Sequence, residues 1–224
     1  MKESYEESWF GWHFLKNDGT TGQGKCKPVP GKLMHCKGEL VLCENGLHAS
    51  QRAIDALKYA PGPIVQRVEL SGTRIDSEDK ACARSRRCLW IADASTTLHE
   101  FTCWCSEGAL TAEREAVREP DPRSWAAPEA KRAWLRGEIT TDGQLDAARN
   151  AARDARNATW NAARSTAAWN AARSTAARDV KSPDWNAAWD AAWNVAWRDA
   201  RSAQNDELER RLLALEPKEE ARMG

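Results

Sequence analysis

The last third of the chain has a composition that favours one kind of secondary structure, the α-helix. Residues 142–178 repeat Ala-Ala pairs separated by polar residues, and residues 161–178 hold two nine-residue copies in succession, NAARSTAAW and NAARSTAAR. Ala has the highest helix propensity, so a long helix is predicted. A nine-residue step turns an ideal helix by about 900°. Successive copies therefore face opposite sides, and the Ala positions spiral around the helix.

A further helix is predicted to start with Pro183 in its first turn. Tryptophans then follow at a spacing of four and form one drifting apolar stripe, which consists of Trp185, Trp189, Trp193 and Trp197. Apolar area is worth roughly 25 cal/mol per Å2 when it is buried, so this stripe should not stay in water. We expect it to pack over Ala of the preceding helix, on the N-terminal domain or on another subunit. A homo-oligomer held by these helices is the expected assembly.

The first half of the chain has a mixed pattern of helix and strand that is centred on residues 43–72. Asn45-Gly46 predicts a turn, Ser50 a helix N-cap, and Pro61 the end of that helix. Apolar and charged residues then alternate over residues 64–70, which indicates a strand. Further strands are expected at residues 8–16, 38–43 and 88–91, a charged turn at residues 76–80, and a helix from Thr97 that ends at Gly108.

These motifs resemble two known families. Seven residues have types and spacings that resemble the second core motif of the ADP-ribosyltransferase fold, in its poly-ADP-ribose-polymerase branch. They are Gly46, Leu47, His48, Tyr59, Val68, Glu69 and Gly72. Residues 12–93 as a whole resemble an uncharacterised domain of phage and prophage proteins, through CENGLHA at residues 43–49 and DKACA at residues 79–83. The first resemblance implies a transferase-like fold, and the second implies a phage accessory protein.

The transferase resemblance also implies a ligand pocket. Tyr59 stands where the family stacks a tyrosine on nicotinamide, and His13 stands where a histidine holds the ribose of NAD. The expected pocket also includes His48 and Arg67. No cofactor is expected, although an NAD or ADP-ribose type ligand would suit such a pocket. Ala56 replaces the family's carboxamide-binding Ser, and no strand-borne Glu follows Gly72. A non-enzymatic role is therefore favoured over an active enzyme.

Arginines and overall charge bear on possible partners. Arg84 and Arg86 could bind a phosphate or pyrophosphate, because guanidinium groups match such oxygens, although a solvated strand face is the simpler interpretation. The chain has 33 basic residues (Lys and Arg) and 33 acidic residues (Asp and Glu). It therefore has no net positive charge that would favour nucleic acid as a partner. No apolar run of membrane-spanning length occurs, and residues 1–8 do not resemble a signal peptide. A cytoplasmic location, in an infected host cell if the chain comes from a phage, is expected.

Seven cysteines lie in the first half of the chain. Free thiols are expected because the count is odd and no secretory signal is present. The spacing between cysteines does not match a zinc knuckle, so no metal site is predicted. A Cys43–His48 dyad is a minor alternative, because no third group is evident that would orient it.

The predicted fold class is α+β. We expect a small mixed, transferase-like domain over residues 1–108, a linker with a short helix near residues 128–136 over 109–139, an Ala-, Arg- and Trp-rich helical region with a long helical hairpin over 140–216, and a frayed tail over 217–224.

Three functions remain open at this point. The first is a non-enzymatic phage accessory module with a degenerate transferase-like pocket, which binds a nucleotide-derived ligand or a host protein, possibly against host defence, and carries a helical partner-binding tail. The second is an active ADP-ribosyltransferase or NAD glycohydrolase. The third is a structural or virion-associated protein.

Overall fold

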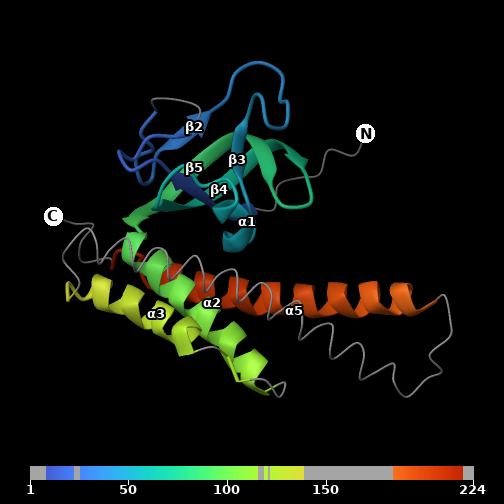
Figure 1. Cartoon of the computed structure of the whole chain (residues 1–224). Coiled ribbons are helices and arrows are strands. Elements are labelled where there is room, and N and C mark those ends of the chain that lie inside the picture. Colours follow the sequence, from blue (N-terminus) through green and yellow to red (C-terminus); the bar gives the residue numbers. More distant parts are fainter. Residues whose placement is uncertain (1–8, 23–25, 116–118, 121, 139–183, 219–224) are drawn as a thin grey trace. The chain divides into compact units, whose positions relative to one another are not determined.

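The computed structural model describes residues 9–22, 26–115, 119–120, 122–138 and 184–218, and no side chain is described for residues 122–124, 127 and 184–198. The fold is α+β, as predicted, with an antiparallel sheet of five strands and four helices among the described residues (Figure 1). Two compact units are present, Met1–Leu98 with Asn205–Gly224, called the sheet unit below, and His99–Gln204. A helix both long enough and apolar enough to span a membrane does not occur in the described part of the chain.

The sheet consists of β1 (Trp9–Leu15), β2 (Leu33–His35), β3 (Leu47–Ala49), β4 (Ile64–Asp76) and β5 (Ala81–Asp93). β4 and β5 form a long hairpin across the charged turn expected from the sequence. β1 pairs with β4, and both β2 and β3 pair with β5. All these pairings are antiparallel. The hairpin is the centre of the sheet, to which the shorter strands are added.

The strand expected at residues 38–43 is wrong. The backbone there bends at Gly38 and Cys43, which have φ angles of +82° and +72°. It forms a tight turn in which Val41 and Asn45 exchange backbone hydrogen bonds of 2.8 and 2.9 Å. The Asn45 amide then donates to the carbonyls of Lys37 and Glu39. Side-chain bonds to the backbone therefore replace strand pairing in this segment.

Four of the strands close into a ring. β1 pairs with β4, β4 with β5 and β5 with β3. Ser50, directly after β3, then exchanges two backbone hydrogen bonds of 2.7 and 3.0 Å with Trp12 of β1. Gly11 makes this closure possible, because a Cβ there would lie 2.8 Å from the Ser50 carbonyl. We call β1, β4, β5 and β3 the strand ring.

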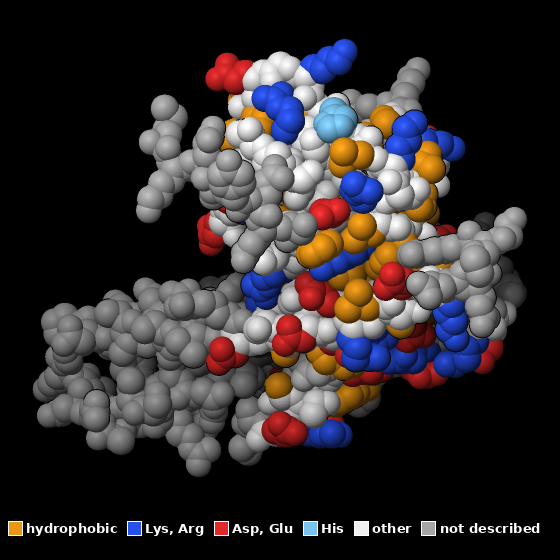
Figure 2. Space-filling model, turned by 180° about the vertical axis from the view of Figure 1, so that it is seen from behind, with side chains coloured by type: hydrophobic (Ala, Val, Ile, Leu, Met, Phe, Trp, Pro, Cys, Tyr) orange, Lys and Arg blue, Asp and Glu red, His pale blue; other side chains and the backbone are white. Residues whose placement is uncertain are grey.

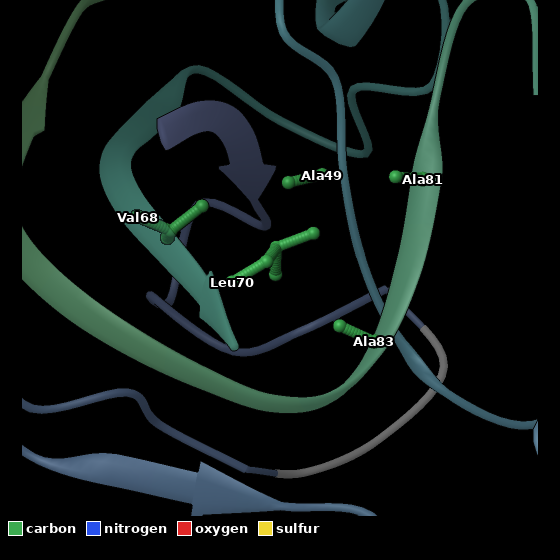
Figure 3. Packing of buried hydrophobic residues seen from close by; sticks show 5 residues of the cluster. All are labelled: Ala49, Val68, Leu70, Ala81 and Ala83. Atoms are coloured by element: carbon green, nitrogen blue, oxygen red, sulfur yellow. The ribbon is translucent and has the colours of Figure 1, made fainter. Parts of the chain in front are cut away.

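The inside of the strand ring holds a small apolar core. Val68, Leu70, Ala49, Ala81 and Ala83 point toward one another from β4, β3 and β5, with Trp9 against them (Figure 3). Each of the five has an exposed fraction of 3% or less. Ala fits here because the interior of a small barrel-like sheet is narrow.

The outer face of β1, β4 and β5 is aromatic. Trp12 and Trp90 are buried there and meet edge to face, with ring centroids 5.9 Å apart. The Arg67 guanidinium lies 4.6 Å from the Trp12 ring centroid. Burial lowers the pKa of Arg67, whereas the charges of Glu209 and Glu216 raise it. The C-terminal residues of the chain therefore contribute to the electrostatics of this face.

Helix α1 (Ala53–Leu57) belongs to the sheet unit and begins later than expected. Ser50 is not its cap, because the backbone of Ser50 is paired with β1. The Asn205 side chain accepts a bond of 3.2 Å from the Ile54 amide, and Glu209 one of 3.0 Å from the Ala53 amide. Both acceptors come from the end of α5 (Asp184–Leu213), which lies in the same compact unit. The helix start predicted from Pro183 stays a prediction, because Pro183 lies outside the described residues.

Helices α2 (Ser95–Glu115) and α3 (Pro122–Leu135) are longer than expected. The side chain that caps the start of α2 is that of Asp93 rather than Thr97. It accepts a hydrogen bond of 2.8 Å from the backbone amide of Ser95. The end predicted at Gly108 is wrong, because one Gly costs a helix only about 1 kcal/mol and Leu110 beyond it is fully buried. Residues 109–115 and most of residues 122–138 are thus helical rather than linker.

In the second unit, α2 and α3 are joined by charged and aromatic contacts. Arg132 of α3 pairs with Glu107 of α2 at 2.8 Å and also with Glu100. His99 and Trp134 meet edge to face, with centroids 5.1 Å apart. Figure 2 shows charged side chains of both signs mixed on the described surface, as the balanced composition predicts.

Candidate functional site

The inner face of the strand ring becomes polar next to its apolar core. In the strand register, His13 lies opposite Gln66, and Arg86 lies opposite Leu70. Directly paired residues point to the same side of a sheet. His13, Gln66 and Arg86 therefore share the face that carries Val68 and Leu70. We call these three residues the inner polar cluster.

Arg86 is the most deeply buried charged residue of this cluster. Its exposed fraction is 3%, and its Nη1 donates to the His48 carbonyl at 2.7 Å. Burial lowers the pKa of Arg86 to about 10, and the nearby thiols of Cys88 and Cys26 oppose that change. Among the described residues, no carboxylate forms an ion pair with Arg86. The cluster therefore holds a buried cation whose charge is not balanced by a described acidic residue.

His13 and Gln66 bond to each other beside this cation. The Nδ1 atom of His13 lies 2.9 Å from Nε2 of Gln66, which is completely buried. The Oε1 atom of Gln66 has no hydrogen-bond partner among the described residues. The pKa of His13 lies well below its usual value, first because of burial and then because of the charges of Arg86 and His48.

His48 stabilises the turn that carries the CENGLHA motif. Its Nε2 accepts a hydrogen bond of 3.0 Å from the Cys43 amide, and it also bonds to the backbone of Gly46. Burial, followed by the charges of Lys80 and Arg86, lowers the pKa of His48. Gly46 has a φ of +154°, and a Cβ at that position would lie 2.9 Å from the Cys82 sulfur. The hydrogen bond between His48 and Cys43 therefore uses the Cys43 backbone rather than its thiol.

Tyr59 lies at the surface, beside a groove at the turn end of the β4–β5 hairpin. Its hydroxyl donates to Asp79 at 2.8 Å, and the Lys80 ammonium lies 4.1 Å from its ring centroid. Lys80 also bonds to the thiol of Cys43, which is the first cause of its raised pKa. The groove has a volume of about 260 Å3. Its lining consists of Trp9, Gln51, Arg52, Asp55, Asp76, Ser77, Glu78, Asp79, Lys80 and Ala81.

The remaining predicted ligand residues lie elsewhere. Arg67 is on the outer face against Trp12. Arg84 donates to the carbonyls of Cys36, at 3.1 Å, and of Gly38, and so holds the β2–β3 connection in place. The structure joins Arg86 to the carbonyl of His48 and places His13 on the same inner face. It does not bring Tyr59, Arg67 or Arg84 into that group.

The four Trp residues of the predicted stripe lie in α5, but their side chains are outside the described part of the chain. The homo-oligomer expected from them stays a prediction. None of the seven cysteines forms a disulfide in the structure. Among the described residues, no group of three or more His, Cys, Asp or Glu side chains could hold a metal ion.

Comparison with known proteins adds no assignment. None of the family models, curated proteins or solved structures compared with the chain matches it.

The sequence interpretation missed Gln66 and the residues that line the groove. Gln66 had a readable signal, because it interrupts the apolar inward positions Ile64, Val68 and Leu70 at the strand period of two. The groove had no readable signal in the sequence, because its lining residues, such as Trp9 and Asp55, come from segments far apart in the chain.

Proposed function

We propose that the protein is a non-enzymatic binding module that docks a partner protein at the groove beside Tyr59. The main observation in support of this proposal is the groove itself, whose lining places Trp9 next to side chains of both charges. Tyr59 stands beside it with an exposed fraction of 51%, and Ile75 is exposed by 37%. Exposed aromatic residues surrounded by charged groups are typical of the centres of protein interfaces.

The charges around the groove support a protein partner over a nucleotide. Lys58 pairs with Asp79 at 3.0 Å, and Arg74 pairs with Asp76 at 2.7 Å. The groove lining itself carries four acidic residues and two cations, Arg52 and Lys80, so it does not concentrate positive charge for a pyrophosphate. The volume of about 260 Å3 also lies below the usual range for sites of drug-sized ligands. Single side chains of a partner fit such a depression.

The groove residues are held in place before any partner binds. Asp79 accepts hydrogen bonds from both Lys58 and Tyr59, at 3.0 and 2.8 Å. The groove wall formed by Asp76 and Ala81 lies at the paired ends of β4 and β5. Prior ordering reduces the entropy that binding must overcome.

A transferase-like pocket and a phage origin remain part of this proposal only through the sequence resemblance. Neither His13 nor His48 bonds to a carboxylate of the described residues, so no geometry favours the alternative of an active transferase. The resemblance of residues 43–49 to phage and prophage domains suggests a host protein as the partner.

The test compares binding by the wild type, Tyr59→Ser and Val29→Ser. Val29 is exposed by 53% and does not line the groove, so its variant is the matched control. A partner captured from host extract is purified, and its dissociation constant is measured for all three proteins. We expect Tyr59→Ser to weaken binding at least tenfold, because aromatic residues at an interface centre commonly contribute this much. The control should bind as the wild type does.

Two outcomes would contradict the proposal. One is equal binding of the purified partner by Tyr59→Ser and the wild type. The other is calorimetric titration in which NAD or ADP-ribose binds to the wild type but not to Tyr59→Ala, because that result would assign the surface near Tyr59 to a nucleotide. Turnover of NAD in the same mixture would then favour an enzyme.

A further inference from the structure

The buried Arg86 calls for an explanation that the groove does not supply. Its guanidinium has five N–H donors, and the hydrogen bond to the His48 carbonyl uses one of its nitrogens. Removing a cation from water is costly unless an opposite charge or further hydrogen bonds compensate. The described neighbours whose charges affect the pKa of Arg86 are the thiols of Cys88 and Cys26. Neutral thiols balance a cation poorly.

The groups around Arg86 are also unusual for a purely structural site. His13 and Arg86 both sit on the inner face, and the charge of Arg86 contributes to the lowered pKa of His13. Gln66 bonds to His13 and leaves one buried amide atom without a described partner. That atom is Oε1 of Gln66, an acceptor that calls for a donor, such as a water or the O–H of a monoprotonated phosphate.

The donor set indicates the chemistry of a fitting ligand. A guanidinium presents parallel N–H groups that match two oxygens of a carboxylate or phosphate. An imidazole that accepts from Gln66 at Nδ1 carries its proton on Nε2 and is a second donor. Only a small group can reach Arg86, whose exposed fraction is 3%. The site suits one oxyanion rather than a complete nucleotide.

We propose that the inner polar cluster binds a single oxyanion, a phosphate or carboxylate group, with Arg86 as its principal donor and His13 beside it. None of the three residues of the inner polar cluster lines the groove, so the inference does not rest on the proposed function. The anion balances the charge of Arg86 inside the ring.

The test measures anion binding to the full chain with inorganic phosphate and acetate as probes, at constant ionic strength set with chloride. Calorimetry and the thermal unfolding midpoint are the readouts. Arg86→Met removes the charge at a similar volume, and Arg87→Met is the matched control because Arg87 is exposed and pairs with Glu69 at 3.5 Å. We expect saturable binding of phosphate or acetate by the wild type and the control, and at least tenfold weaker binding by Arg86→Met.

The result also decides between sources of the oxyanion. Tighter binding of phosphate indicates a phosphate group, and tighter binding of acetate indicates a carboxylate. Should Arg86→Met fail to fold, Arg86→Gln takes its place, because it removes the charge but keeps a polar side chain, and His13→Gln is measured beside it. Absence of saturable binding by the wild type at millimolar phosphate and acetate would overturn the inference. Unchanged binding by the folded Arg86 variant would do so as well, and either result would assign the cluster to ordered water.

Discussion

His13 stays neutral at pH values where an exposed histidine takes up a proton. Its pKa is lowered by burial and by the positive charge of Arg86. The pKa values of His48 and His99 are lowered as well, in both cases mainly by burial. The unfolded chain has no such burial, so its histidines are protonated near pH 6.5. Acid therefore favours the unfolded state through these residues.

We predict that the free energy of unfolding falls as the pH is lowered from 7.5 to 5.5. Each such histidine contributes a loss of up to about 1.4 kcal/mol per pH unit below its unfolded pKa, because the unfolded state binds the proton and the folded state does not. His13→Gln should reduce this pH dependence by up to one proton. Urea unfolding at several pH values measures it. An identical pH dependence in the variant and the wild type would show that His13 is protonated in the folded protein.

At the residue scale, chemistry alone did not identify where side chains lie. Arg67, Arg84 and Arg86 were placed together on the sequence as ligand residues. Strand register then separated them: Arg67 faces outward, and Arg86 faces inward. Arg84 bonds to the carbonyl of Gly38, in a loop where the sequence predicts a strand. Positive φ angles at Gly38 and Cys43 bend the backbone there and prevent a regular strand. A positive φ angle at a cysteine cannot be predicted from the sequence.

Helix α1 shows which elements could be predicted and which could not. The approximate position of the helix and the strand that follows it were readable from Pro61 and from the alternation over residues 64–70. The cap was not, because Asn205 and Glu209 come from more than 150 residues later in the chain. Local capping rules find only acceptors that are close in sequence. Local rules predict Ser50 as the N-cap, but the backbone of Ser50 pairs with Trp12 of β1 instead.

We predict that Asn205→Ala destabilises the sheet unit by about 1 kcal/mol, the usual cost of losing a side-chain acceptor at a helix start. Glu209→Ala should cost a similar amount. Asp206→Ala is the control, because Asp206 is exposed on the same helix and a surface substitution usually changes stability by less than about 0.5 kcal/mol. Urea unfolding followed by circular dichroism measures all three. Equal midpoints for Asn205→Ala and Asp206→Ala would contradict the capping role.

The whole chain is divided in a way that its composition does not reveal. The sequence suggested a sheet domain first and a helical region after it. The sheet unit instead combines Met1–Leu98 with Asn205–Gly224, so the end of α5 belongs to it. Leu208 and Leu212 in that segment have no exposed surface. Composition separates regions of different character, but packing decides which of them fold together.

We predict that a chain ending at residue 204 loses its folded sheet unit. The deletion removes two caps worth about 1 kcal/mol each and two buried Leu side chains, each worth about 2–5 kcal/mol. The sum is comparable with the total stability of a domain. A chain ending at residue 218 is the control. Limited proteolysis should cleave the shorter chain within residues 64–93 and leave the control intact there. Equal protection of both chains would contradict this.

The late arrival of Asn205, Leu208 and Glu209 has a consequence for synthesis on the ribosome. The strands are complete in the growing chain when residue 98 has been made, but 106 further residues precede Asn205. At roughly 5–20 residues per second, the nascent strands wait about 5–20 s for the segment that caps α1. Their aromatic outer face lacks that segment throughout the wait. We therefore expect the nascent sheet to need protection from non-native contacts until translation ends.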